Sequence, residues 1–432
     1  MRFSTKAAAM TLLGATALSS AASAGGLDRS FQSVSAIFND PETISFSLSY
    51  VEPDLKGRDV GATGGTGSYD AGDGYAQYQF SYTNRINDRF SYAIINDQPF
   101  GADIFYADDP LTSNIGGTEA DLESDAFSFI GKYDFNDRIS VFGGPRLQRT
   151  SGVVALNGQA YANAIAVRAV AAQAGVDAGV LGAALQGDID ALTVLGGGNP
   201  QAGAAAAQQL GAGVQQAASG FLATGGYEVE LEDDWNFGLT LGAAYEIPEI
   251  ALRLAITYHS EISHDNETVE TFGIVNPEPI PGVIEFASPQ SVNIDFQTGI
   301  NERTLLLAGL RWTDWDDFDV VPQTLGSDLA DIDDAYRWSL GVARRFTEEF
   351  VGLATLTYEK DNGSETVSPL GPTDGLIGLS LGGRYTRGAL NVSGGVSYNW
   401  VGSAQAGVAD QPVALFDDSS AIGVGLKIDY RF

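Results

Sequence analysis

The lengths of the connections between candidate strands constrain the fold of this chain more than any other feature. Fourteen segments alternate apolar with small or polar side chains, as strands with one buried face do. They cover residues 43–54, 74–86, 89–106 with an interruption, 123–134, 137–150, 235–246, 249–262, 289–300, 302–315, 335–346, 349–360, 374–386, 388–401 and 419–432. The connections after odd-numbered segments are long, for example 107–122, 151–234, 263–288, 316–334 and 402–418, whereas those after even-numbered segments are turns such as Asn87-Asp88.

Long loops on one rim and short turns on the other are typical of outer-membrane β-barrels. A soluble sandwich is not expected to sort its connections in this way. The last segment agrees, because AIGVGLKIDYRF has one apolar face and one small or charged face and ends on an aromatic residue, Phe432. The sequence therefore predicts an all-β fold, a 14-stranded antiparallel transmembrane β-barrel over residues 42–432.

The first residues have the features of a signal peptide. Arg2 and Lys6 precede an apolar stretch, and Ala22-Ser23-Ala24 is a small-residue cleavage site, so residues 1–24 are expected to be removed. After them there is no apolar run of roughly 18 residues, which a membrane-spanning helix would need. The mature protein is thus expected either in soluble form outside the cytoplasm or as a barrel in the bacterial outer membrane.

Charge and composition exclude some functions. The chain has no cysteine, so no disulfide stabilises it. Without Arg2 and Lys6, 21 basic residues stand against 55 acidic ones, and this excess argues against nucleic acid as a partner. The acidic residues gather in the long connections, where they either form a solvated surface or hold Ca²⁺. Their spacing matches no known calcium loop, so no metal site and no cofactor are predicted.

The longest connection, 151–234, is unlike the others. It is rich in Ala, Gln and Gly and has apolar residues at helical spacing. Asn199-Pro200 is expected to separate two helical pieces. The apolar stripe either packs the helices together or forms an exposed apolar groove for a substrate. The groove candidates are Leu181, Leu185, Leu210, Val214 and Phe221.

Catalytic motifs are scarce. The sequence has two histidines, His259 and His264, and no nucleophile elbow, zinc-protease motif or phosphate-binding loop. His259 has inward parity on its strand, so it is either a hydrogen-bonded wall residue or the base of an outer-membrane lipase. The sequence predicts that the protein is not an enzyme and keeps the lipase as an alternative.

Several local motifs, in their order, resemble the FadL family of outer-membrane long-chain fatty-acid transporters. The stretch from Thr43 to Leu55 resembles the first strand of that family, and Pro99-Phe100-Gly101 resembles the P-F-G motif of its third strand. Trp312-Thr313-Asp314-Trp315 with Phe318 resembles an aromatic run in the ninth strand. The fourteen strands, a segment before the barrel and a helical insertion after the fifth strand also fit the family.

The resemblance implies a transport route. A hydrophobic molecule would be caught in a groove between the loops 151–234 and 263–288 and then pass into the barrel. A plug, here residues 25–41 with Phe31, Phe38, Asn39 and Pro41, would shift, although this segment is shorter than the plug of the family and lacks its N-P-A motif. The molecule would leave sideways at Pro99, Phe100 and Gly101, where Pro lacks a donor and weakens the ladder. The alternatives are a frayed N-terminal arm and a plain β-bulge.

Four arginines of inward parity, Arg253, Arg311, Arg337 and Arg384, are candidates for binding a substrate carboxylate or for salt bridges in the lumen. The sequence predicts passive uptake of hydrophobic molecules, with long-chain fatty acids as the leading class. A general or cation-selective porin is the second alternative, beside the lipase. We expect a monomer in the outer membrane with extracellular long loops and periplasmic termini. The expected partners are membrane lipid, lipopolysaccharide, the hydrophobic substrate and the barrel-assembly machinery.

Overall fold

A computed structural model describes residues 27–61, 64–272, 276–330 and 332–432. The predicted signal peptide and the first two residues of the predicted plug lie outside this range. Seventeen strand segments form one closed sheet, in which β5 with β6, β10 with β11 and β12 with β13 each continue one another, so the barrel has fourteen strands. The segments are β1 (Thr43–Asp54), β4 (Tyr75–Asn87), β5 (Phe90–Asp97), β6 (Gly101–Phe105), β7 (Glu119–Asp134), β8 (Ile139–Leu156), β9 (Tyr227–Ile247), β10 (Leu252–His259), β11 (Ile262–Phe272), β12 (Asn276–Ser288), β13 (Ser291–Asn301), β14 (Thr304–Thr313), β15 (Ala335–Arg345), β16 (Phe350–Glu359), β17 (Leu376–Arg387), β18 (Leu390–Val401) and β21 (Ser420–Arg431).

The first and last strands close the barrel. β21 pairs with β18 on one side and with β1 on the other, where the register runs from Thr43 opposite Arg431 to Asp54 opposite Ser420. Every barrel pairing is antiparallel, which confirms the predicted fold class. A closed sheet leaves no unpaired edge, and this is the condition for strands to span a membrane.

Alternation along the strands gives the barrel an apolar outer face. On β1, Phe46, Leu48 and Tyr50 are exposed on the outside, whereas Ser45 is buried. On β21, Val424 and Leu426 are exposed and Lys427 is buried. Exposed apolar residues in this number are stable only against lipid.

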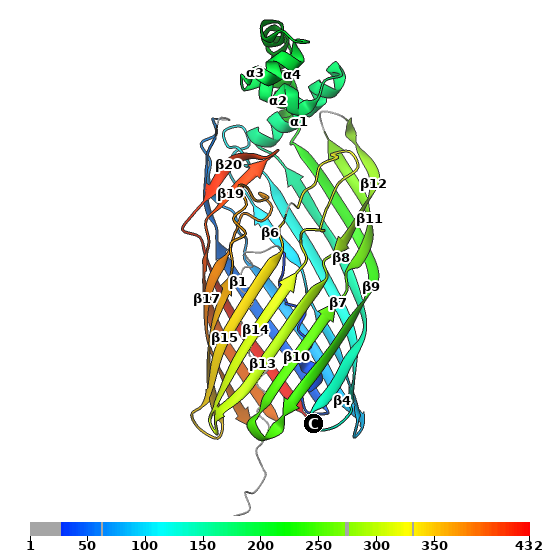
Figure 1. The fold of residues 1–432 in the computed structure, drawn as a ribbon, viewed down its shortest axis with the longest axis vertical. Helices are drawn as coiled ribbons and strands as arrows, with labels where there is room; N and C mark the ends of the chain where they lie inside the picture. The colour runs from blue at the N-terminus through cyan, green and yellow to red at the C-terminus, as the bar shows by residue number, and fades with distance from the viewer. Residues whose placement is uncertain (1–26, 62–63, 273–275, 331) are drawn as a thin grey trace, which may run out of the picture.

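The two ends of the barrel differ (Figure 1). One end has short turns and the C-terminus, and we call it the short-turn end. The other, the long-loop end, has a bundle of four helices that stands above the rim: α1 (Gln159–Ala174), α2 (Ala178–Leu185), α3 (Ile189–Leu195) and α4 (Pro200–Ala223). Asn199 caps α4, because its Oδ1 accepts from the backbone N of Gln201 at 2.9 Å and Pro200 takes the first helical position. The predicted break at Asn199-Pro200 is thus confirmed, with four helices in place of two. Within the described residues no single helix is long and apolar enough to span a membrane, and the bent pair α1 and α2 passes by length and composition only.

A small second sheet covers part of the long-loop end. It has the order β19 (Ala404–Val408), β20 (Gln411–Phe416), β2 (Lys56–Asp59) and β3 (Ser68–Asp70), so it joins the connection after β1 to the connection before β21. Tyr69, Tyr106 and Phe416 pack together beneath it, with ring centroids 5.2 to 6.2 Å apart. The sequence prediction missed this sheet, since its strands are only three to six residues long.

The prediction of a loop over residues 263–288 is wrong, because most of this segment is a hairpin of β11 and β12 that extends the barrel wall. β11 alternates between buried and exposed side chains: the buried ones include Ile262, His264 and Asn266, and the residues between them are exposed. Its inner face is therefore mostly polar. β8 also runs to Leu156 and β9 begins at Tyr227, so the helical connection spans 157–226 and not 151–234. Apolar periodicity alone could not find strands whose inward residues are polar.

Candidate functional site

The third strand of the barrel is interrupted at the predicted place. β5 ends at Asp97 and β6 begins at Gly101, and β6 pairs with β7 but not with β4. Side chains partly replace the missing ladder, because Gln77 Nε2 donates to the Gln98 carbonyl at 3.4 Å and the Tyr78 backbone N donates to Gln98 Oε1 at 3.1 Å. Pro99 has no N–H to offer a neighbouring strand. We call the stretch Gln98–Gly101, which has no ladder partner on β4, the β5–β6 break.

The N-terminal segment pairs with this break through its main chain. The Arg29 backbone N donates to the Pro99 carbonyl at 2.8 Å, and the Gly101 backbone N donates to the Leu27 carbonyl at 2.9 Å. Asp28 thereby stands opposite Phe100 in an antiparallel bridge. The main chain of Leu27 and Arg29 in the predicted plug therefore supplies hydrogen bonds that a neighbouring strand would otherwise make.

An ion pair holds the same segment to the opposite wall. Arg311 on β14 donates from Nε and Nη2 to the two carboxylate oxygens of Asp28, at 2.7 and 2.8 Å, and both side chains are more than nine-tenths buried. Arg311 also donates to Asn293 Oδ1 at 2.9 Å. A second pair joins Arg29 to Asp103 of β6. Paired, hydrogen-bonded charges are the form in which a buried arginine is stable.

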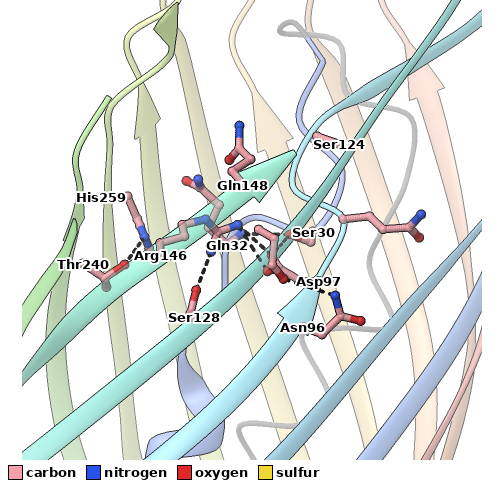
Figure 2. A network of polar contacts seen from close by, with 12 residues as sticks. Ser30, Gln32, Asn96, Asp97, Ser124, Ser128, Arg146, Gln148, Thr240 and His259 are labelled. Carbon is pink, nitrogen blue, oxygen red and sulfur yellow. Dashed lines mark hydrogen bonds and ion pairs between the residues drawn. The ribbon is translucent and has the colours of Figure 1, made fainter. Parts of the chain in front are cut away.

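A polar network continues from the break into the lumen (Figure 2). Arg146 on β8 donates to both carboxylate oxygens of Asp97, each at 3.2 Å, and to Ser128 Oγ at 3.0 Å. Ser30 Oγ of the N-terminal segment donates to the same Asp97. His259 takes part at the far side, with its Nδ1 3.0 Å from Thr240 Oγ1. Such a network fixes the N-terminal segment at the end of β5.

The four predicted plug residues contact the wall below this network. The Phe31 ring lies 4.5 Å from the Arg337 guanidinium, and the Phe38 ring lies 4.2 Å from that of Arg253. Asn39 Nδ2 donates to Ser45 Oγ at 3.5 Å, and Pro41 lines a polar cavity at the short-turn end. The described part of the segment is thus in contact with the barrel along its length.

The candidates Arg253, Arg311 and Arg337 form ion pairs with carboxylates of the chain. Besides Arg311, Arg253 pairs with Glu246 at 2.7 Å and Arg337 with Glu359 at 2.6 Å. Arg384 lies on β17 opposite Ser393 of β18. Binding of a substrate carboxylate by any of them stays a prediction.

An apolar cavity of about 190 Å³ lies above the N-terminal segment, on the long-loop side. Leu27, Phe100 and Gly101 form its floor at the β5–β6 break, so the cavity borders the interruption in the wall. The loop between β14 and β15 supplies Trp315 and Phe318, whose rings are 5.2 Å apart, and Trp315 also packs on Phe100 at 5.4 Å. The aromatic run noted in the sequence therefore lines this pocket.

Polar side chains from β11 and α1 fix the loop that lines the pocket. Glu270 on β11 accepts from the backbone N atoms of Thr324 and Leu325, at 3.0 and 3.2 Å, and from the Tyr227 hydroxyl at 2.8 Å. Arg168 on α1 donates to the Leu325 carbonyl at 2.9 Å. Sequence analysis missed both residues, because nothing in the sequence shows that Glu270 is buried.

The predicted groove residues lie mostly inside the helical bundle. Leu181, Val214 and Phe221 are buried, Leu210 is half-buried, and only Leu185 is exposed, at 37%. Phe221 packs edge-on against Phe272 of β11, with centroids 6.2 Å apart. The packing of the helices therefore accounts for most of the apolar stripe, and a role in substrate capture stays a prediction.

The remaining candidates are histidines and acidic clusters. His264 Nδ1 lies 2.8 Å from Asp234 Oδ2. Among the described residues, no group of three or more His, Asp or Glu side chains is arranged to hold a metal ion.

The features described so far are a closed barrel with an interrupted third strand, a segment paired inside it and an apolar pocket above that segment. Known proteins share them to the extent that the following comparisons show. The family model described as outer membrane protein transport protein (OMPP1/FadL/TodX) matches residues 8–432. The chain belongs to this family. The resemblance found in the sequence is thereby confirmed, and the family places the barrel in the outer membrane and its role in transport.

Solved structures of the OMPP1/FadL/TodX family have the same fold. A FadL homologue from Pseudomonas aeruginosa superimposes with a TM-score of 0.64 at 16% identity, over 92% of this chain and 94% of that one. The toluene transporter TodX of P. putida gives 0.57 at 13% identity, over 92% of each chain. The toluene transporter TbuX of Ralstonia pickettii gives 0.54 at 13% identity, over 94% of this chain and 95% of that one. Among curated protein sequences, none matches this chain.

Proposed function

We propose that the protein takes up hydrophobic molecules, with long-chain fatty acids as the leading class, and releases them sideways at the β5–β6 break. The long loops face outward and both termini face the periplasm. Uptake is passive, and the protein is not an enzyme. The observation that carries this proposal is the position of the apolar pocket, whose floor at Phe100 and Gly101 is the place where the wall lacks its ladder.

The chemistry of the solute favours a sideways exit. An apolar molecule that leaves the pocket through the wall enters lipid directly, so it never exposes its surface to water. Leu27–Arg29 pairs with the break and closes it, so this segment has to move before the solute can pass. The polar contacts at Asp97 and Arg311 hold it in the closed position.

Small aromatic hydrocarbons are a second candidate substrate class. The pocket of about 190 Å³ is of the size of a cavity of about 150 Å³ that binds benzene in another protein. Two relatives with this fold are toluene transporters. Aromatic walls such as Trp315 and Phe318 suit flat apolar rings as well as alkyl chains.

The test is uptake of a labelled long-chain fatty acid and of labelled toluene by cells that lack transporters for both. Because the chain has no cysteine, Tyr78→Cys with Gln98→Cys introduces a single disulfide across the β5–β6 break, where the β4–β5 register continued past Phe80 and Asn96 brings these two positions opposite each other. The matched control, Ser380→Cys with Ser397→Cys, joins register partners in the intact β17–β18 ladder.

We expect oxidation of the Tyr78/Gln98 pair to lower uptake and reductant to restore it, with no effect of oxidation on the control pair. Unchanged uptake after complete disulfide formation would contradict lateral release at the break. If a correctly inserted barrel takes up neither compound, transport of these classes is wrong, and a large ion conductance would then support the porin. Ester hydrolysis that disappears in His259→Ala would support the lipase.

A further inference from the structure

The wall has a second interruption, between β9 and the strand formed by β10 and β11. β9 pairs with β10 from Thr240 to Ile247 and with β11 from Tyr227 to Leu231. The two ladders have the same register, but between them residues 232–239 of β9 and 260–267 of the neighbouring strand are not paired with each other. We call this stretch the β9–β11 seam. One backbone bond, from the Ser260 N to the Leu239 carbonyl at 2.9 Å, closes its lower end.

An extra residue in each strand explains the seam. Residues on one face of a strand are an even number of positions apart. His259 and Ile262 are both buried although they are three positions apart, and Leu231 and Gly238 are both buried although they are seven apart. Each strand therefore has a bulge, and the two bulges lie at opposite ends of the seam, so the residues between them are out of step with the ladders above and below.

Side chains close the seam in place of the main chain. Asn266 Nδ2 donates to the Glu232 carbonyl at 2.7 Å and to the Thr150 carbonyl of β8 at 3.0 Å. The His264–Asp234 contact lies beside it, and Ser260 Oγ accepts from the Leu239 backbone N at 2.9 Å. A side chain can change its rotamer without the breaking of a strand ladder, so this closure is easier to open than paired backbone.

Apolar surface lies on both sides of this polar closure. On the inside, the His264 ring packs on Phe286 with centroids 5.5 Å apart, and Phe286 lines the pocket together with Leu231. On the outside, the seam is flanked by Trp235, Phe237 and Leu239, which are 45%, 69% and 55% exposed. One layer of polar side chains thus separates the apolar pocket from the membrane.

The seam lies close to the β5–β6 break around the barrel. Ser124 of β7, whose Oγ donates to the Phe100 carbonyl at 2.7 Å, is the register partner of Thr150 on β8, and the Thr150 carbonyl accepts from Asn266. Four strands, from the β5–β6 strand to β9, stand between the two gaps, and Leu231 and Phe286, which adjoin the seam, line the same pocket as Phe100 of the break.

We infer that the β9–β11 seam is a second side portal, through which apolar molecules pass between the pocket and the membrane when His264 and Asn266 swing aside. This inference rests on the proposed transport of hydrophobic molecules. It assigns to His264 and Asn266 the role of a closure, and it gives the pocket two exits into lipid.

The first test measures lipid access and needs no transport. Ser288, which lines the pocket, is changed to cysteine and labelled with bimane in an otherwise cysteine-free barrel. The barrel is placed in bilayers that contain phospholipids with brominated acyl chains, which quench bimane on contact. We expect His264→Ala to increase the quenching, because the seam then opens to lipid. The control is Asn399→Ala, at a buried polar position in the intact wall of β18.

Heat-modified mobility on gels shows whether both barrels are folded. If they are, equal quenching in His264→Ala and in the barrel with the unchanged seam would overturn the inference of a second portal. Asn266→Ala serves as the second opening variant if His264→Ala fails to fold. Because bimane reports contact with lipid and not uptake, this result stands whether or not fatty acid or toluene is transported.

The second test measures uptake with each exit locked. A Cβ added to Gly238 would meet the Ile262 side chain, so Gly238→Cys with Ile262→Cys brings two thiols together across the seam. We expect this lock to lower uptake, the Tyr78/Gln98 lock to lower it, and the two together to abolish it, reversibly with reductant. The inference of a second portal would be overturned if the seam lock lowered uptake neither by itself nor in the barrel whose β5–β6 break is also locked.

Discussion

The two halves of the barrel wall are built differently. From β14 through β18 and β21 to β1, every ladder runs without a shift in register. Between β4 and β11 the wall has the β5–β6 break, a register shift between β8 and β9, and the β9–β11 seam. The regular half supplies the stability of a continuous sheet. The interruptions lie in the other half, whose strands line the apolar pocket.

The two interruptions are also closed by different means. Main chain and buried ion pairs of Leu27–Arg29 close the β5–β6 break, whereas single side chains close the β9–β11 seam. The first closure must therefore move as a segment and the second can move one residue at a time. Variants that affect only one of them should separate their contributions.

Loss of the buried pair at the first closure is expected to have the largest effect. Arg311→Leu leaves the Asp28 carboxylate buried without a cation, at a cost of about 3–5 kcal/mol. Hydrogen exchange of residues 27–41 should rise sharply. The control is Arg431→Ala, which removes an exposed pair with Asp40 from the same segment and should cost about 0–1 kcal/mol. Equal exchange in the two variants would show that the pair does not hold the segment.

Phe221 anchors the helical bundle to the interrupted half of the wall. Loss of this contact should destabilise the bundle about as much as loss of the buried ion pair destabilises the N-terminal segment. Phe221→Ala leaves a cavity against Phe272 of β11, and such changes cost about 3–5 kcal/mol. We expect faster proteolysis within 157–226. Ile189→Ala is the control, because this side chain is 70% exposed and surface changes stay within about 0.5 kcal/mol. Similar cleavage of both variants would mean that the bundle does not depend on this contact.

The seam should be visible in the unmodified protein. Amides of residues 232–239 lack ladder partners on the β10–β11 side, whereas those of Thr240 to Ile247 have them. A net hydrogen bond is worth about 0.5–1.5 kcal/mol, so the first group should exchange faster by a corresponding factor. Exchange by mass spectrometry on overlapping peptides measures this. Uniform protection along β9 would contradict the difference between the two halves.

The smallest effect is expected at the exposed loop between β14 and β15. The neighbouring carboxylates, Asp334 foremost, raise the pKa of Asp316 above its usual value. Repulsion is therefore present at neutral pH and is lost as the pH falls through this raised pKa, so residues 314–334 should become more protected on mild acidification. Asp316→Asn should remove most of this pH dependence, as measured by exchange corrected for its intrinsic rate. If exchange in Asp316→Asn kept the same pH dependence as in the unchanged protein, Asp316 would be ruled out as the source of that dependence.

The regular half of the molecule could be predicted from sequence, and the interrupted half could be predicted only in part. Apolar alternation located β17, β18 and β21 within a few residues, because their outer faces are continuous. Pro99 marked the first break by its chemistry. The seam left no such mark, since Ser260 and Glu261 are ordinary residues and the bulge depends on what lies opposite. Polar residues buried by tertiary contact, such as Asn266 and Glu270, look like loop residues in the sequence.

Closure of the sheet by β1 and β21 determines the order in which the molecule can assemble. The pairing of Thr43 with Arg431 joins positions from almost opposite ends of the chain, so it costs the most loop entropy and forms late. Until β21 arrives, β1 presents a long unpaired edge that could pair with another chain. The strand that joins last therefore also removes the exposed edge, and a barrel that stalls before β21 pairs is the form most open to aggregation.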